Sequence, residues 1–227
     1  MTSYNEPRRV AERYLEFNVP ELKRAVAKAI NRDEVDVLNM SKLSEGGFNR
    51  TFEIMMKDGL QIIARLPYPS TFPKRYAVAS EVATMGLVRA YGLPVPRIYD
   101  YAITADNPVA SEYIIMEKVH RREIGHSWYD LTVQEKKIVT LDVAKLEALL
   151  FAIPLPASGS VYYKKDLLPN DRNIEIPGRD GLCIGPDVAM KWWHDRRDLL
   201  SVDRGPCKCI SLSSIFSVNC QNSQQRQ

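Results

Sequence analysis

The sequence predicts an α+β protein in which helices pack against an antiparallel sheet. Residues 41–66 contain three apolar runs, separated by a pair of glycines and by Asp58-Gly59. An Asp-Gly pair between apolar runs is typical of a β-hairpin turn. Residues 74–91 then carry apolar side chains at helical spacing. The order of strands followed by a helix predicts a sheet with one face covered by that helix.

Composition and charge exclude several classes of protein. The chain has 227 residues, a hydrophobic fraction of 45%, and 31 basic against 28 acidic residues. This length fits one large domain or two small lobes. The near balance of charge argues against nucleic acid or a membrane surface as the partner. No apolar run approaches the ~20 residues that a membrane-spanning helix needs.

The cysteines do not indicate a disulfide framework or a metal site. All of them lie late in the chain, at Cys183, Cys207, Cys209 and Cys220. Zinc pairs usually have two to four residues between cysteines, whereas Cys207 and Cys209 have one. We therefore expect a chance cluster in a chain whose body is typical of an intracellular protein.

The other predicted elements surround the hairpin. A short helix at residues 6–17 precedes a second one, which Asn18 caps and which extends to residue 30. Further strands are expected at residues 35–43, 97–101 and 113–116. The first of these precedes the glycine turn, and the other two follow the helix of residues 74–91.

The second half of the chain is predicted to be mostly helical. Thr132 and Glu135 form a capping-box pattern that opens a long helix. Prolines end this helix, and residues 156–186 are rich in Pro, Gly, Asn and Asp, which predicts an ordered loop. Another helix is expected at residues 187–200, where two adjacent tryptophans are more often used for packing than as a stacking platform.

This order of elements resembles the N-lobe of a protein-kinase-like fold. The stretches LSEGGFNRTFEI, IIARLPYPSTFPKRYAVASEVATM and GLPVPRIYDY are similar to the aminoglycoside phosphotransferase and choline kinase family. With NPVASEYIIMEKV and FAIPLPASGSVYY, they resemble its fungal "altered inheritance of mitochondria" branch. The resemblance covers roughly residues 8–206. With it we divide the chain into a helical flank at residues 1–35, an N-lobe at 36–119 and a partial C-lobe at 120–206. The atypical tail at 207–227 resembles no part of the family, and its Ser- and Gln-rich composition without helical periodicity predicts disorder.

The resemblance implies a site for ATP under the hairpin. Gly46, Gly47 and Asn49 match the turn that covers the nucleotide, where glycines let the backbone approach phosphates. An ordinary turn or bulge is the alternative for these residues. Arg65 takes the place of the third-strand lysine, and a guanidinium can bind phosphate with two parallel hydrogen bonds. Glu81 on the next helix would orient Arg65, although a solvated helix glutamate is the alternative.

The adenine side of the implied site lies at the end of the strand of residues 113–116. Met116 matches the residue that lines the adenine pocket. Glu117 and Val119 would offer backbone groups to the edge of the base. Because backbone groups are used there, the side chains of Glu117 and Val119 say little about this role.

The parts that perform phosphoryl transfer in this family do not occur in the sequence. The chemistry needs an aspartate followed by an asparagine in a catalytic loop, and a second aspartate that holds Mg²⁺. The sequences after His120, His126 and His194 do not fit such a loop. We expect these parts to lie beyond the end of this chain. The chain would then be either a truncated gene model or a natural short form.

The sequence is compatible with three functions. The chain could be the nucleotide-binding part of an ATP-dependent phosphotransferase with an unknown small-molecule hydroxyl acceptor. It could instead be a non-catalytic, pseudokinase-like binding module, or an inactive fragment. The resemblance implies a mitochondrial location, but acidic residues among the N-terminal arginines give no clear transit peptide, and a cytoplasmic location is the alternative.

Overall fold

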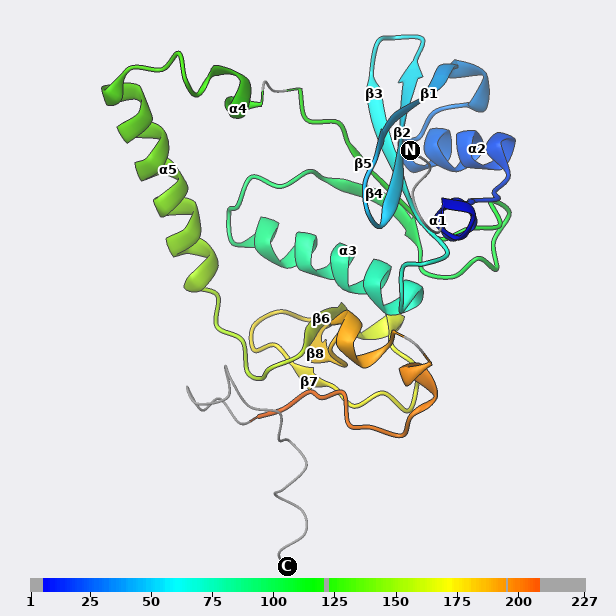
Figure 1. Ribbon diagram of the computed structural model, residues 1–227, viewed down its shortest axis with the longest axis vertical. Coiled ribbons are helices and arrows are strands. Elements are labelled where there is room, and N and C mark those ends of the chain that lie inside the picture. Colours follow the sequence, from blue (N-terminus) through cyan, green and yellow to red (C-terminus); the bar gives the residue numbers. More distant parts are fainter. Residues whose placement is uncertain (1–5, 121–122, 195, 209–227) are drawn as a thin grey trace, which may run out of the picture.

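The computed structural model describes residues 6–120, 123–194 and 196–208 of the chain (Figure 1). The helices are α1 (Glu6–Glu12), α2 (Val19–Ala29), α3 (Lys74–Ala90), α4 (Ile124–Ser127) and α5 (Val133–Phe151). The first sheet consists of β1 (Val37–Glu45), β2 (Asn49–Met56), β3 (Gln61–Pro67), β4 (Ile98–Ala102) and β5 (Tyr113–Glu117). A second, smaller sheet consists of β6 (Ser160–Tyr163), β7 (Ile174–Glu175) and β8 (Leu182–Gly185).

The five-stranded sheet confirms the predicted α+β class. Its order is β1-β2-β3-β5-β4, and every neighbouring pair is antiparallel. The Asp58-Gly59 turn joins β2 to β3, and Gly59 has a φ of 87°, a conformation that glycine adopts without steric cost. The hairpin expected from the sequence is therefore formed by the residues predicted to form it.

Helix α2 covers one face of this sheet. Leu22 and Val26 of α2 are fully buried against Ile62, Ala64 and Ile115. The Asn18 side chain accepts a hydrogen bond from the Glu21 amide at 3.2 Å, which confirms it as the N-cap. Ile62, Ala64 and Ile115 belong, with Leu22 and Val26, to the larger of the two hydrophobic cores that contact the five-stranded sheet.

Helix α3 lies on the opposite face and also contacts the smaller sheet. Val78 and Val82 of α3 pack on Ile63, Ile114 and Met116. Further along the same helix, the side chains of Ala83 and Leu87 pack into the core under β6 and β8. Figure 1 shows α3 between the two sheets, so its two faces join them.

The smaller sheet corrects the prediction of a loop at residues 156–186. β8 pairs with both β6 and β7, and Tyr162, Cys183 and Ile184 are fully buried. Strands β6 and β8 are each four residues long, and about twenty residues of sequence separate these paired strands. Such non-local pairing has no local periodicity to indicate it.

The helix expected at residues 187–200 is also wrong. Two short 3₁₀ helices occur there, Met190–Trp192 and Arg197–Leu199, and Arg196 between them has a left-handed φ of 64°. The Arg204 guanidinium donates to the carbonyls of Trp192, Arg197 and Leu200, which ties the two 3₁₀ turns together across the interruption at Arg196. Trp193 lies against Tyr76 with ring centroids 5.2 Å apart, in agreement with the packing role predicted for it.

Helix α5 has the predicted start but not a buried face. The Thr132 hydroxyl accepts from the Glu135 amide, and the Glu135 carboxylate accepts from the Thr132 amide at 2.8 Å, which completes the capping box. None of the residues of α5 is buried within the described part of the chain. The tail prediction beyond residue 208 lies outside the described residues.

Candidate functional site

The α3 side of the five-stranded sheet is covered only in part. Helix α3 lies against β4 and β5, at one edge of the sheet. The register places Ser41, Glu53 and Ile63 in one row across β1, β2 and β3, and Ser44, Thr51 and Arg65 in another. The rows lie on the α3 side, and their β1 members are exposed. A polar, accessible surface therefore extends from Arg65 to β1.

Arg65 and Glu81 form an ion pair at the boundary between the open and the covered parts of this face. The Arg65 Nη1 atom donates a hydrogen bond to the Glu81 Oε1 atom. The two side chains are 33% and 32% exposed, so solvent reaches both. Only Nη1 of Arg65 is engaged by the described residues, and the other N–H donors of the guanidinium are open. This pairing is the one that the family resemblance implied.

The glycine turn between β1 and β2 is fixed to the segment that precedes α3. The Gly46 amide donates to the Asn49 carbonyl at 3.0 Å. The Phe48 carbonyl accepts from the Tyr68 amide at 2.9 Å and from the Thr71 hydroxyl at 2.6 Å. These bonds fix the position of the turn. The turn begins two residue pairs from Arg65 on the β2–β3 ladder, which corresponds to a separation of about 7 Å along the strands.

The fold itself does not require glycine at this turn. Neither Gly46 nor Gly47 has a positive φ. A Cβ atom at Gly46 would meet its nearest neighbour at 3.8 Å, and one at Gly47 would meet nothing within 4 Å. The space above the turn is therefore available to a ligand, and the absence of side chains leaves the backbone accessible.

Met116 lies on the other side of Arg65 from the glycine turn. It is 3% exposed and pairs with Ile63 of β3, two residue pairs from the row of Arg65. Because alternate strand residues share a face, Met116 and Arg65 lie on the same side of the sheet. The structure therefore brings Asn49, Arg65, Glu81 and Met116 to one region of the molecule.

Glu117 and Val119 differ in whether their backbone groups are already hydrogen-bonded within the described part of the chain. The Glu117 amide donates to the Arg97 carbonyl at 2.8 Å, and the Glu117 carboxylate accepts from the Arg97 amide at 3.0 Å. These bonds give Glu117 a structural role that the sequence did not indicate. Val119 is 47% exposed, and its backbone groups make no hydrogen bond within the described residues.

Lys118 and Glu53 are residues that sequence reasoning missed. The Lys118 Nζ atom lies 2.6 Å from Glu53 Oε2, and the side chains are 23% and 14% exposed. This ion pair ties the segment after β5 to β2 on the same face of the sheet as Arg65. Their opposite charges were visible in the sequence, but they are separated by 65 residues, and only the strand order brings them together.

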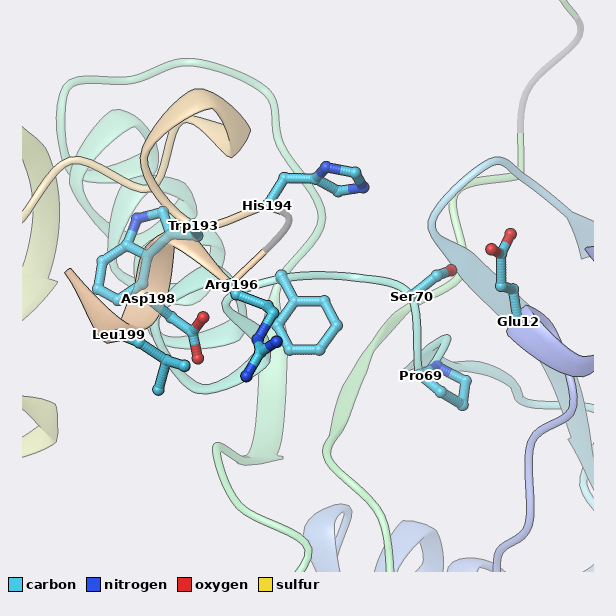
Figure 2. A pocket seen from close by; sticks show the side chains of 9 residues that line it. Glu12, Pro69, Ser70, Trp193, His194, Arg196, Asp198 and Leu199 are labelled. Atoms are coloured by element: carbon cyan, nitrogen blue, oxygen red, sulfur yellow. The ribbon is translucent and has the colours of Figure 1, made fainter.

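A cavity of about 450 Å³ lies elsewhere, between the segment after β3 and the 3₁₀ turns near Trp193. Figure 2 shows Ser70 and Glu12 on one side of it and His194 and Arg196 on the other. None of the residues predicted to bind nucleotide lines this cavity. It is therefore separate from the Arg65 region.

The residues near Arg65 do not form a metal site. In the ranges that the structure describes, no group of three or more His, Cys, Asp or Glu side chains is placed to hold a metal ion. The donor set therefore does not fit Mg²⁺. Cys209 and Cys220 lie outside the described residues, as do Arg121 and Arg122.

The fold and the site define an α+β lobe in which Arg65 of a strand pairs with Glu81 of a helix. Comparison with known proteins shows that the chain is similar in sequence to several fungal proteins. The chain is 42% identical over 177 residues to a subtelomeric hrmA-associated cluster protein of Aspergillus fumigatus. That match covers 78% of this chain and 34% of the relative. No protein-family model matches the chain.

More distant relatives come from yeasts. The protein named altered inheritance of mitochondria protein 9, mitochondrial, of Saccharomyces cerevisiae is 27% identical over 179 residues, with 74% of this chain and 28% of that protein covered. Its namesake in Kluyveromyces lactis is 26% identical over 191 residues, with 76% and 30% covered. The chain thus spans about a third of the length of the curated relatives it matches. No helix in the described ranges has the length and apolar character to cross a bilayer.

Proposed function

We propose that this chain binds ATP as the N-lobe of a protein-kinase-like fold of the aminoglycoside phosphotransferase type. The observation that carries the proposal is the Arg65–Glu81 pair at the edge of an open, polar sheet face. Arg65 contacts the phosphates through its open N–H donors, and Glu81 fixes the direction of the guanidinium. The resemblance of the surrounding sequence to that family supports the same assignment.

The remaining predicted residues take their places around Arg65 in this proposal. The amides of the Gly46-Gly47 turn approach the phosphates from above. Asn49, at the start of β2, lines the same side. Met116 borders the adenine, and the backbone of Val119, which makes no hydrogen bond to the described residues, offers a donor and an acceptor to its edge. The bonds that Glu117 makes with Arg97 leave its carbonyl, rather than its amide, for the base.

We further propose that the longer relatives transfer a phosphoryl group from ATP to a small hydroxyl compound. The sequences after His120, His126 and His194 do not fit the catalytic loop that this step needs, so the proposal for this chain is nucleotide binding alone. A non-catalytic binding module, which would retain the lobe for contact with a partner, is the alternative. The names of the yeast relatives support a mitochondrial location at most.

Calorimetric titration with Mg-ATP tests the proposal. We expect saturable binding that weakens at least about tenfold in Arg65→Gln, because a hydrogen bond to a charged group contributes roughly 1.5–3 kcal/mol. Arg32→Gln is the matched control, since Arg32 also forms an ion pair, with Asp58 at 2.8 Å, but at the opposite end of the strands. Equal loss in both variants, or no binding to the unmodified chain, would reject the proposal.

A further inference from the structure

The ion pair between Lys118 and Glu53 lies where the cover provided by α3 ends. Glu53 pairs with Ile63 of β3, which pairs with Met116 of β5, so these residues form one row on the α3 side of the sheet. Ile63 and Met116 are buried and pack against α3. On the β1 side of Glu53, the row continues with the exposed Ser41. The pair therefore borders the open part of this face.

This ion pair has hydrogen-bonding groups left for a ligand. The Lys118 Nζ atom donates to the Glu53 Oε2 atom at 2.6 Å. Neither side chain makes another hydrogen bond within the residues that the structure describes. An ammonium carries three N–H donors, and a carboxylate has two acceptor oxygens. Two N–H donors of Lys118 and the Oε1 atom of Glu53 therefore remain for a ligand.

The stability of the fold is a poor explanation for this pair. The side chains of Lys118 and Glu53 are 23% and 14% exposed, so each charge has lost part of its contact with water. This loss offsets much of the attraction between the charges, and apolar side chains of similar size often stabilise a fold equally well. Ile63 and Met116, in the same row, are such apolar side chains. A charged pair at this border therefore indicates contact with a polar ligand.

In the proposed nucleotide site, the pair lies between the groups assigned to the base and the group assigned to the phosphates. The base is assigned to the backbone of Glu117 and Val119, at the end of β5. The phosphates are assigned to Arg65, two residues from Ile63 along β3, which corresponds to about 7 Å. The ribose joins the base to the phosphates, so it crosses the row of Ile63. Glu53 is the charged member of that row.

We propose that Glu53 and Lys118 bind the ribose hydroxyls of the nucleotide, an inference that rests on the proposed function. The Oε1 atom of Glu53 accepts a hydrogen bond from one hydroxyl, as acidic side chains do for the ribose of dinucleotides. The Lys118 ammonium donates to the oxygen of the other hydroxyl. Hydrogen bonds to charged groups are stronger than those between neutral groups. The pair therefore selects ribonucleotides over nucleotides that lack these hydroxyls.

Calorimetric titration of the full chain with Mg-ATP and with the magnesium complex of dideoxy-ATP, which lacks both ribose hydroxyls, tests this inference. We expect ATP to bind about tenfold or more tightly than dideoxy-ATP. Equal binding of the two nucleotides would overturn the role of the pair and leave the proposed ATP site standing. Absence of binding of either nucleotide would reject the ATP site and this inference together.

A double variant tests whether the preference comes from this pair. Glu53→Gln with Lys118→Met removes both charges, so neither is left unpaired. The preference for ATP should fall to about twofold, and the affinity for dideoxy-ATP should stay within about twofold of that of the unmodified chain. Near-UV circular dichroism checks that the fold is retained. A purely structural pair would weaken both nucleotides equally and keep the preference, which would overturn the inference.

The matched control is a second Lys–Glu pair, on the smaller sheet. The Lys164 Nζ atom lies 2.7 Å from a carboxylate oxygen of Glu175. Lys164→Met with Glu175→Gln should retain the tenfold preference for ATP, because this pair takes no part in the proposed site. Equal loss of the preference in both double variants would overturn the assignment of the ribose hydroxyls to Glu53 and Lys118.

Discussion

Arg65 and Glu81 meet although one lies on a strand and the other on a helix 16 residues later. Both side chains are about one-third exposed, and ion pairs with that much solvent contact add at most about 1 kcal/mol to stability. The pair is therefore poorly explained by a need to stabilise the fold. In the proposed nucleotide site, the pair holds a cation in one direction beside an open surface.

The glycine turn gives a prediction that separates folding from binding. Gly47→Ala should leave the free energy of unfolding unchanged within about 0.5 kcal/mol, because a Cβ there meets nothing within 4 Å and φ is not positive. The same substitution should weaken Mg-ATP binding, since the Cβ occupies the approach to the backbone. Urea unfolding and calorimetry measure the two effects.

Gly59→Ala is the control for this prediction. Gly59 has a φ of 87°, so alanine there should cost roughly 1–2 kcal/mol of stability and leave ATP binding unaltered. A loss of stability without a loss of binding in Gly47→Ala would contradict the proposed role of the turn.

The family resemblance implied that Arg65, Glu81 and Met116 are neighbours, and local patterns predicted the strands and the helix that contain them. The contacts of Glu117 with Arg97 and of Lys118 with Glu53 could not be predicted in this way. They depend on β4 and β5 pairing in a particular register, including an irregularity between Ile98 and Asp100. A single sequence contains no local signal for such a register.

At the scale of elements, α3 and α5 show that similar apolar spacing leads to different burial. Leu87 of α3 is 2% exposed and packs into the core under the smaller sheet. Leu146 of α5 is 38% exposed, and α5 has no buried residue in the described part of the chain. The spacing in α5 predicted the helix correctly but could not show what, if anything, covers its apolar side.

This difference should appear directly in stability measurements. Leu87→Ala should lower the free energy of unfolding by about 2–5 kcal/mol, because it removes buried methyl groups and leaves a cavity. Leu146→Ala should change it by less than about 0.5 kcal/mol, as is usual for exposed positions. Chemical denaturation of both variants gives the comparison, and a large effect of Leu146→Ala would mean that α5 is packed in solution.

The smaller sheet marks the limit of prediction for the fold. Residues 156–186 contain many turn-forming residues, and this composition favoured a loop. The strands there are two to four residues long and are stabilised by pairing with one another and by packing on α3. Short strands of this kind are specified by tertiary contacts rather than by local propensity.

At the scale of the whole molecule, side chains of α3 and β4 join the larger sheet to the smaller one. The Tyr76 hydroxyl donates to the Asp171 carboxylate at 2.9 Å, and the Tyr101 hydroxyl donates to Asp166 at 2.8 Å. The Arg75 guanidinium donates to the Asp166 carbonyl at 3.1 Å. Burial and then the bond to Asp171 raise the pKa of Tyr76 from 10.0 to about 12. The junction is therefore sensitive to alkaline pH.

The junction predicts a loss of stability at high pH. Because the pKa of Tyr76 is higher in the folded chain, its contribution is fully present below about pH 10 and is lost as pH rises to about 12. Tyr76→Phe should be less stable at pH 8 by on the order of 1 kcal/mol. The difference between the two proteins should shrink between pH 10 and 12 when unfolding is measured. A constant difference over that range would show that Tyr76 does not ionise there.

Amide chemical shifts of the labelled chain, recorded during titration with Mg-ATP, test the central claim most directly. The account predicts that the shifts cluster at Gly46, Gly47, Arg65 and Val119 and saturate together. Arg65→Gln should reduce these shifts at a given ATP concentration. Shifts confined to residues outside the open sheet face, or no saturable shifts, would contradict the assignment of this face as a nucleotide site.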